Sequence, residues 1–534
     1  MPMRTVAFPE KKWDLMDSST ERSDGRLLAG LAALVSVVAL VWNFRHGLIL
    51  LPNDAIAHIN DARRIFDSQT PGLRQLGTVW LPLPQLLQAP FLLSDTLWRT
   101  GIGGCIPSMV AYGAGVLGIF RLVRGQSSRT VAWMAALIYA LNPNLVYMQA
   151  TPMAEAIYLA LFIWAVVYFD EFRRIAATDP AAGRRLLLRC ALVLSASMLV
   201  RYDGWFLAAC VFAGVLLVVW RDHLRGRELR SGLAQFAALI ALTAGAWLAY
   251  NHFVYGNSLD FVTGLYSVRG ITERTTMAAY PGRGDLRTSA IFFLRAATLN
   301  TGAVWGHVSL LNLAFVALIA AAYFSRRHLA GLLLWVPVVF YVINIAWNSV
   351  IIFLPEWWPF SYYNVRYGLQ LLPAIAVFVA LGCGFLMKLA PARYCMAAVV
   401  LIVLISYGLV LRDGPICLGE AQANGAPRQA LDIHVARALL PLSLSPDATF
   451  MIDLRMRSGV ALQAGIHFKR ILHPGMYQAW KQGIANPSAA ADYVIAVTGD
   501  EVDQAVRAHP QGLELIATVD TPGQARAFVY RTMR

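Results

Sequence analysis

The chain has 534 residues, of which 57% are hydrophobic and only 14% are charged, and its net charge is +14. Soluble proteins average about 25% charged residues, so a single soluble core cannot hold this much apolar surface. The basic residues lie in short clusters between apolar runs and form no basic face with interleaved aromatic residues, which argues against a nucleic-acid partner.

Apolar runs recur along the chain, and most have the length of about 18 to 25 residues that a helix needs to cross a membrane. They predict an all-α polytopic membrane protein of about eleven spans, near 27–45, 103–122, 130–147, 153–170, 186–201, 204–220, 231–250, 302–324, 329–353, 367–388 and 394–411. The polar first 26 residues do not resemble a cleavable signal peptide, so the first span is expected to stay as an anchor.

The basic clusters set the orientation of these spans. Clusters such as Arg121, Arg124 and Arg129 lie in short connections, and the positive-inside rule places such connections in the cytoplasm. Residues 1–26 are then a cytoplasmic tail, whereas the long segments 46–102 and 251–301 lie outside. Within the first of these outer segments, residues 54–67 and 81–94 predict two helices that lie along the membrane surface.

The composition changes to that of an ordinary soluble protein after residue 411. Helical patterns alternate there with short β-rich runs, so residues 412–534 predict a small extracytoplasmic α/β domain beyond the membrane domain 27–411. The chain carries no glycine-rich phosphate loop and no zinc motif, so we expect no nucleotide cofactor.

Ionisable residues collect at the predicted outer boundary, where they are costly to hold near lipid. Asp54, His58 and Asp61 have helical spacing on one face of the first surface helix, and Glu155 begins the fourth span. Asp54 and Glu155 together suit acid–base chemistry or a divalent cation. His58 and Asp61 are candidate substrate contacts. Alternatively, Asp54 caps its helix, Glu155 interacts with the dipole of its helix, His58 is an ordinary interfacial residue, and Asp61 pairs with Arg64.

A second group of candidates lies at the same boundary. Residues 355–366 (PEWWPFSYYNVR) combine aromatic residues, Tyr363 among them, with Arg366, whose guanidinium suits a phosphate. An aromatic interfacial belt is the alternative explanation for the aromatic residues. Arg201 and Asp203 lie at a similar depth, where Arg201 either binds substrate or pairs with Asp203.

These residues carry a resemblance to a known family. Asp54 after the first span and the stretches LGTVWLPLPQLL (76–87), NPNLVYMQATPMAEAIYLAL (142–161), RYDGW (201–205) and NVRYGLQLLP (364–373) resemble glycosyltransferase family 39. That family belongs to the C-type superfamily of membrane glycosyltransferases, together with the protein O-mannosyltransferases and the lipid A aminoarabinose transferase. The resemblance covers roughly residues 27–411.

The resemblance implies an enzyme of the plasma (inner) membrane that takes a sugar from a polyprenyl phosphate on the extracytoplasmic side and inverts its anomeric centre. It assigns the role of general base to Asp54 and a catalytic role to Glu155. The implied acceptor is a glycan, a lipid or a protein. The paired Asp-Glu of the mannosyltransferases is here Asp54-Ala55, which puts both protein as acceptor and mannose as sugar in doubt.

Two other classes of function fit the same sequence. A polytopic transporter or lipid flippase would place polar residues at mid-membrane and carry broken helices in matching halves, whereas here the polar residues gather at the outer boundary. A non-catalytic scaffold for envelope assembly would keep the fold without the chemistry. Loss of activity on changing Asp54 separates the enzyme from both.

Overall fold

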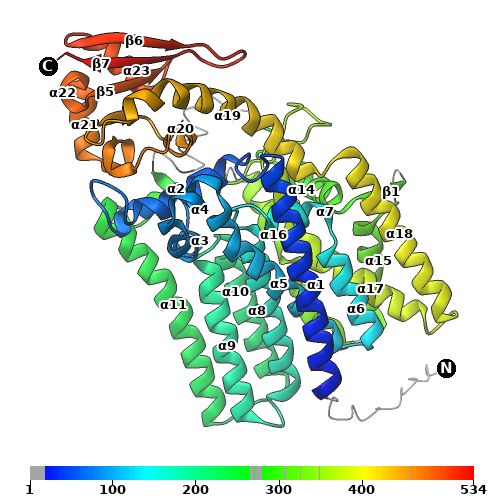
Figure 1. Cartoon of the computed structure of the whole chain (residues 1–534). Coiled ribbons are helices and arrows are strands. Elements are labelled where there is room, and N and C mark those ends of the chain that lie inside the picture. Colours follow the sequence, from blue (N-terminus) through cyan, green and yellow to red (C-terminus); the bar gives the residue numbers. More distant parts are fainter. Residues whose placement is uncertain are drawn as a thin grey trace, which may run out of the picture.

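A computed structural model describes residues 18–264, 267, 270, 280–305, 308–324, 326–347, 349–455 and 457–533. Long helices pack side by side in a bundle, and a β-sheet lies beyond one end of it (Figure 1). The described chain begins at the opposite end of the bundle with α1 (Ser18–Arg45), so the sheet and the start of α1 are far apart. Residues 1–17 of the predicted cytoplasmic tail lie outside the described residues.

The membrane region is almost entirely helical. After α1 its helices are α2 (Asn53–Arg64), η1 (Leu73–Leu76), α3 (Leu83–Gln88), η2 (Ala89–Leu93), α4 (Asp95–Thr100), α5 (Ile102–Arg124), α6 (Arg129–Ala140), α7 (Pro143–Gln149), α8 (Glu155–Ile175), α9 (Pro180–Met198), α10 (Asp203–Arg221), α11 (Arg227–Tyr255), α12 (Asp260–Thr263), α14 (Leu286–Thr301), α15 (Leu310–Phe324), η3 (Arg326–Trp335), α16 (Val336–Ala346), η4 (Val365–Leu371), α17 (Leu372–Leu386) and α18 (Ala392–Asp413). Two short strands, β1 (Ala303–Trp305) and β2 (Val308–Ser309), precede α15.

The described residues contain fewer membrane-spanning helices than the eleven predicted. Six are long and apolar enough to cross a membrane, and a seventh results if the bent pair α6 and α7 is one span. The other predicted spans are shorter or carry more charge: 302–324 begins with β1 and β2, and 329–353 divides into η3 and the eleven-residue α16. Length and hydropathy of a run do not reveal such breaks. The predicted spans 153–170 and 186–201, by contrast, form the unbroken helices α8 and α9, which carry more charge. The protein is a multi-pass membrane protein all the same.

The break between α6 and α7 shows how local sequence redirects the chain. Asn142 accepts a hydrogen bond from the backbone N–H of Leu145 and so caps α7, and Pro143 follows at the first helical position. The two helices consequently meet at an angle of 63°. The turn directs the chain toward Glu155 at the start of α8.

The first of the two helices predicted in the outer segment is present as α2, and the second divides into α3 and η2, while their position along the membrane surface stays a prediction. With α4 they lie across the end of the bundle that faces the sheet (Figure 1). The side chain of Arg63 in α2 helps to hold them together, because it donates to the carbonyl oxygen of Leu92 at 2.6 Å and to Asp95 at 2.6 Å. These contacts hold the short helices together as one layer at this end of the bundle.

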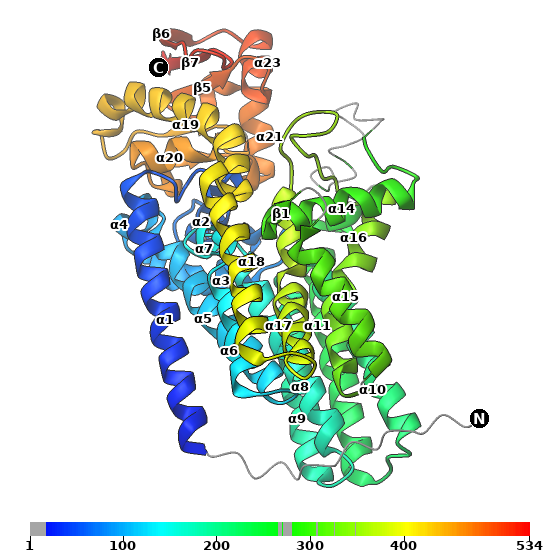
Figure 2. The ribbon, with the colours of Figure 1, turned by 90° about the vertical axis from the view of Figure 1, so that its right-hand side faces the viewer.

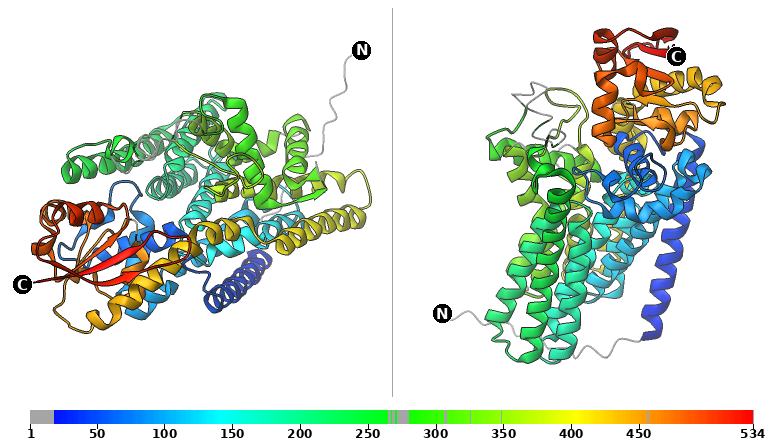
Figure 3. Two further views of the ribbon diagram at one scale, coloured as in Figure 1. Left: turned by 90° about the horizontal axis from the view of Figure 1, so that it is seen from above. Right: turned by 90° about the vertical axis from the view of Figure 1, so that its left-hand side faces the viewer.

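The C-terminal region contains a mixed five-stranded sheet with the order β4-β3-β5-β7-β6. The strands are β3 (Phe450–Ile452), β4 (Ile471–Leu472), β5 (Tyr493–Val497), β6 (Leu513–Val519) and β7 (Ala527–Thr532), with the helices α19 (Ile416–Ser443), α20 (Ser458–Ala464), η5 (Phe468–Arg470), η6 (Pro474–Met476), α21 (Gln478–Ala485), α22 (Pro487–Ala490) and α23 (Glu501–Ala508). β3 pairs in parallel with β4 and β5, and β7 pairs antiparallel with β5 and β6. Figure 3 shows, from above, that the sheet covers one side of the bundle.

The helix α19 joins the C-terminal region to the membrane helices. It follows α18 after a short turn and runs beneath the sheet (Figure 2). Its first turn is anchored by Cys417, whose backbone N–H donates to Asn144 at 2.9 Å and whose thiol donates to Asn300 at 3.1 Å. Near the middle of α19, Gly425 lies directly against the backbone of Leu51, just before α2.

This close approach makes a testable prediction about docking. An alanine Cβ at position 425 would lie 1.9 Å from the carbonyl oxygen of Leu51, so α19 would have to move away. We expect Gly425→Ala to lower the free energy of unfolding by about 1–3 kcal/mol, as overpacking usually does. Thermal unfolding of the purified chain in detergent measures the change.

Gly408 provides the control, since it lies in α18 and no atom lies within 4 Å of the point that an alanine Cβ would occupy there. Gly408→Ala is expected to leave stability unchanged or to raise it by up to about 1 kcal/mol, because alanine favours a helix more than glycine does. Equal unfolding temperatures for Gly425→Ala and the unmodified chain would contradict the described packing of α19 on Leu51.

Candidate active site

Arg366 is the centre of a cluster of charged side chains at the end of the bundle nearest the sheet. Each nitrogen of its guanidinium contacts a different carboxylate: Nη2 lies 2.5 Å from Asp54, Nε 3.1 Å from Glu155, and Nη1 2.6 Å from Glu420. These acids belong to α2, α8 and α19, so one side chain connects three parts of the chain. Asp54 is 312 residues away from Arg366 in the sequence.

Glu155 is the most deeply buried member of the cluster, with a side chain only 2% exposed. Its Oε1 atom accepts from Arg366 and also from Nη1 of Arg201, at 3.5 Å. Its Oε2 atom is buried and has no hydrogen-bond partner in the described part of the chain. Because a buried polar oxygen without a partner is costly, the two contacts from Arg366 and Arg201 to the other oxygen partly offset the burial of Glu155.

Arg201 forms a second layer behind Glu155. Its Nε atom contacts Asp203 at 3.1 Å, and its Nη2 donates to the hydroxyl of Tyr341 at 3.0 Å, which in turn donates to Asp203 at 2.9 Å. The ring of Tyr367 lies 4.6 Å from the guanidinium carbon of Arg201 and 5.2 Å from that of Arg366. The sequence left open whether Arg201 pairs with Asp203, and the structure places the two in contact while Arg201 also reaches Glu155.

Asp54 is the most accessible of the three acids on Arg366, with 32% of its side chain exposed. It lies in the first turn of α2, yet its carboxylate does not cap the helix, because the cap position is Pro52 and no side chain caps this end. The carboxylate therefore contacts Arg366 and remains open to solvent or a substrate. Tyr363 lies close by: burial and the charge of Asp54 raise its pKa to about 12.

His58 lies one turn after Asp54 and is buried. The side-chain amide of Gln85 donates to its Nδ1 at 3.0 Å, and its ring lies 4.6 Å from that of Trp80. Burial lowers the pKa of His58, while the charges of Asp54 and Glu155 partly oppose the shift. His58 is consequently a neutral imidazole beside the cluster, and it contacts Gln85 and Trp80 rather than Arg366.

Asp61 forms an ion pair with Arg64, which was the alternative given for it from the sequence. Its carboxylate pairs with Arg64, one turn further along α2, at 2.5 Å, and both side chains are nearly buried. Asp61 makes no described contact with Arg366, although both Asp54 and Asp61 lie on α2. Helical spacing therefore placed Asp61 on the helix correctly but did not bring it into the cluster.

The buried position of Asp61 predicts a pH effect on stability. Burial raises its pKa from 3.8 to about 6, even though Arg64 lowers it. Between these values the folded chain holds the proton more tightly than the unfolded chain, so stability falls as the pH rises. From about pH 5 to about pH 7.5, unmodified protein should lose about 1 kcal/mol more than the Asp61→Asn variant. Equal pH slopes in chemical unfolding would contradict this.

Glu420 belongs to the cluster but was not predicted from the sequence. It lies in the first turns of α19, and its side chain is only 8% exposed. Glu420 lies nine positions after the last predicted span, close to the predicted outer boundary, so it could have been selected as a candidate on the same ground as Asp54 and Glu155. It was assigned instead to the separate C-terminal domain, where no contact with Arg366 was expected.

The cluster contains more negative than positive groups. Two guanidiniums, of Arg366 and Arg201, face the four carboxylates of Asp54, Glu155, Glu420 and Asp203. Such an excess would suit a cation, but the described chain holds no group of three or more His, Cys, Asp or Glu side chains arranged for a metal ion. Asp54 and Glu155 as ligands of a divalent cation therefore remain a prediction.

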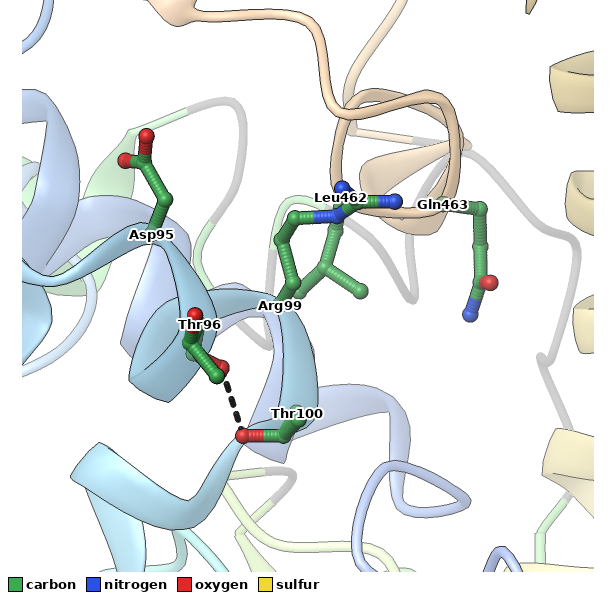
Figure 4. A pocket seen from close by; sticks show the side chains of 6 residues that line it. All are labelled: Asp95, Thr96, Arg99, Thr100, Leu462 and Gln463. Carbon is green, nitrogen blue, oxygen red and sulfur yellow. Dashed lines mark hydrogen bonds between the residues drawn. The ribbon is translucent and has the colours of Figure 1, made fainter.

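Two described cavities lie elsewhere. One, of about 370 Å³, opens between α4 and α20 (Figure 4) and is lined by Asp95, Thr96, Arg99, Thr100, Leu462 and Gln463. The other, of about 270 Å³, lies near residues 172–229 and includes Phe172 and Leu229. Neither includes a member of the Arg366 cluster.

Comparisons with known proteins bear on the fold. No family model matches the chain, and no curated protein matches it in sequence. Among solved structures, ArnT from Cupriavidus metallidurans bound to undecaprenyl phosphate is similar over 94% of this chain and 97% of its own, with a TM-score of 0.58 and 13% identity. The Archaeoglobus fulgidus oligosaccharyltransferase in complex with Zn and sulfate is similar over 95% of this chain and 73% of its own, with a TM-score of 0.51 and 13% identity.

The chain has a C-type membrane glycosyltransferase fold. The motifs in the sequence predicted a fold of this kind, and the structural similarity, at 13% identity, confirms the fold. Because 94% of the chain is covered, the similarity extends beyond residue 411, where the resemblance in sequence ended.

Proposed function

We propose that the chain is an inverting glycosyltransferase, related to glycosyltransferase family 39, that moves a sugar from a polyprenyl-phosphate donor to an acceptor hydroxyl. The reaction takes place at the Arg366 cluster, on the extracytoplasmic side of the plasma membrane. Asp54 is the general base, Arg366 binds the donor phosphate, and Glu155 holds Arg366 in position.

One observation carries this proposal: Asp54, a partly exposed carboxylate, lies 2.5 Å from the guanidinium of Arg366 at the end of the membrane helices. A base and a cation this close can act on the two ends of one transfer, the acceptor hydroxyl and the departing phosphate. The relatives support the donor class. ArnT was solved with undecaprenyl phosphate, and the archaeal oligosaccharyltransferase with a dolichol-phosphate and an inhibitory peptide.

The chemistry follows from the positions of these groups. The acceptor hydroxyl loses its proton to Asp54 while its oxygen forms a bond to the anomeric carbon of the sugar. On the opposite face of the sugar, the bond from that carbon to the phosphate oxygen breaks, and the electron pair leaves with the polyprenyl phosphate. Attack on one face and departure from the other invert the anomeric centre. Arg366 stabilises the charge that gathers on the leaving phosphate.

The second layer of the cluster suits the binding of a polar substrate. Arg201 bridges Glu155 and Asp203, and the charge of Asp54 acts on both His58 and Tyr363, which places these two side chains near it in space. We assign substrate contacts to Arg201, His58 and Tyr363. Glycan, lipid and protein remain alternative acceptors. The groups of the cluster can bind a hydroxyl, but they do not distinguish which of these molecules bears it.

Donor consumption tests the proposal. Proteoliposomes that contain the purified chain are incubated with polyprenyl phosphates carrying different radiolabelled sugars, together with an envelope extract as acceptor. Unmodified protein should release polyprenyl phosphate and transfer label from one donor, and Asp54→Asn should not. If folded, inserted protein consumes no donor, or if both proteins act equally, the assignment fails and the transporter and scaffold alternatives take its place.

A further inference from the structure

Glu420 occupies a site that binds both oxygens of its carboxylate. Oε1 accepts from the backbone N–H of Asn364 at 2.9 Å and from Nη1 of Arg366 at 2.6 Å. Oε2 accepts from the backbone N–H of Arg366 at 3.3 Å. We call these three donors the 364/366 anion site.

The backbone at this site has the geometry of an anion-binding turn. Asn364 is one of the few described residues other than glycine with positive φ, at φ 55° and ψ 24°. A residue in this left-handed conformation beside right-handed ones turns nearby N–H groups toward one point, an arrangement that binds phosphates and other anions. The side chain of Asn364 donates to the carbonyl oxygen of Ile351 at 2.9 Å, which holds the turn in place.

The 364/366 anion site lies next to the proposed base. The same guanidinium that binds Glu420 through Nη1 binds Asp54 through Nη2. An anion at the site of Glu420 is therefore separated from Asp54 by one guanidinium group. This is where the proposed reaction needs the donor phosphate, because the base and the leaving group act on opposite faces of one sugar.

The charges at the site allow an exchange. Arg366 carries one positive charge and already contacts three carboxylates, so a donor phosphate cannot bind it closely without replacing one of them. Glu155 is held by two arginines, and Asp54 is the proposed base. Glu420 is the remaining acid, and a phosphodiester with a single negative charge replaces its carboxylate without changing the charge on Arg366.

We propose that the 364/366 anion site binds the phosphate of the polyprenyl-phosphate donor, and that Glu420 is an internal carboxylate that fills the site when no donor is present. This inference rests on the proposed function and names the phosphate position within it. After transfer, the departing polyprenyl phosphate still occupies the site as the product, and the return of Glu420 with α19 then helps to release it.

Equilibrium binding tests this inference without any sugar transfer. The purified full chain in lipid nanodiscs is titrated with undecaprenyl phosphate, with undecaprenol and with inorganic phosphate. Because Glu420 competes for the site, Glu420→Gln should tighten binding of undecaprenyl phosphate by about tenfold or more. Binding of undecaprenol should not change. The control is Glu356→Gln, which removes the partner of Arg295 at a more exposed ion pair outside the cluster and should leave all three affinities unchanged.

The outcomes of this titration separate the alternatives. Unchanged or weaker binding of undecaprenyl phosphate by Glu420→Gln would overturn the inference, because a carboxylate that only positions Arg366 helps the ligand to bind and does not compete with it. Tighter binding of inorganic phosphate alone would also overturn it, since the lipid would then be excluded. Tighter binding of undecaprenyl phosphate by a chain that transfers no sugar would keep the anion site and refute the proposed function instead.

A second readout covers the case in which Glu420→Gln does not fold. In unmodified protein, saturating undecaprenyl phosphate should increase amide hydrogen exchange in the first turns of α19, around residues 416–424, as Glu420 leaves the site. Exchange at the amides of Asn364 and Arg366 should stay slow, because the phosphate replaces Glu420 as their acceptor. No change in α19 on saturation would contradict the displacement of Glu420.

Discussion

Replacing Asp54 with asparagine is expected to lower kcat for sugar transfer by about 10²- to 10⁴-fold, the usual contribution of a general base. Asparagine keeps the size of the side chain and can still accept a hydrogen bond from Arg366, so the fold should survive. It cannot take the proton of the acceptor hydroxyl. Initial rates at saturating donor measure the loss, and KM for the donor should change far less than kcat.

Asp61→Asn is the matched control for this prediction. It makes the same chemical change on the same helix, but Asp61 pairs with Arg64 and makes no described contact with Arg366. Its transfer rate at neutral pH should remain close to that of unmodified protein. A comparable loss of rate in both variants would indicate that the carboxylates of α2 support structure, and Asp54 would lose its assigned role.

Replacing Arg366 with methionine is expected to lower the free energy of unfolding by about 3–5 kcal/mol, the cost of removing one partner from buried ion pairs. Methionine fills a similar volume without charge, so the loss reports mainly on electrostatics. Glu155 and Glu420, with side chains 2% and 8% exposed, would be left without their shared cation. Chemical unfolding of the chain in mixed micelles measures the difference.

Arg295→Met is the control for this second prediction. Arg295 pairs with Glu356 through two hydrogen bonds of 2.7 and 2.8 Å, but the two side chains are 31% and 40% exposed. Exposed pairs contribute about 0–1 kcal/mol, so stability should change little. If both arginine variants unfold at the same denaturant concentration, the ion pairs of Arg366 contribute no more to the free energy of unfolding than the exposed pair of Arg295 does. That result would contradict this prediction.

Much of the fold could be predicted because lipid imposes a simple rule on the sequence. Long apolar runs such as 103–122 and 204–220 became α5 and α10, since a helix satisfies its own backbone groups in hydrocarbon. The rule fails where an apolar run is not one continuous α-helix, as in 329–353, where η3 precedes a short α16 that has Pro337 in its first turn. Such a break is buried against other helices and leaves no mark on hydropathy.

Four members of the candidate site were selected from the sequence, whereas Glu420 was not, and the contacts within the site could not be predicted. Charge at a membrane boundary selected Asp54, Glu155, Arg201 and Arg366, because burial of ionisable groups there is costly without a reason. The structure brings these four together through Arg366 and Glu155. Which cation meets which acid depends on packing between residues up to 312 positions apart, and no local pattern carries that information. For the same reason the sequence could not decide whether Asp61 joins this cluster or pairs with Arg64, and the structure shows the pair.

The contacts at the start of α19 limit which C-terminal regions can be combined with this helix bundle by recombination. Glu420 reaches Arg366 only because Cys417 and Gly425 dock α19 on Asn144, Asn300 and Leu51. A gene that exchanged its last quarter with that of a distant relative would keep every membrane helix. It would, however, replace the α19 residues that contact Arg366, Asn144 and Leu51. The region after residue 411 and the bundle therefore form one unit of selection, and recombination between them is expected to be rare.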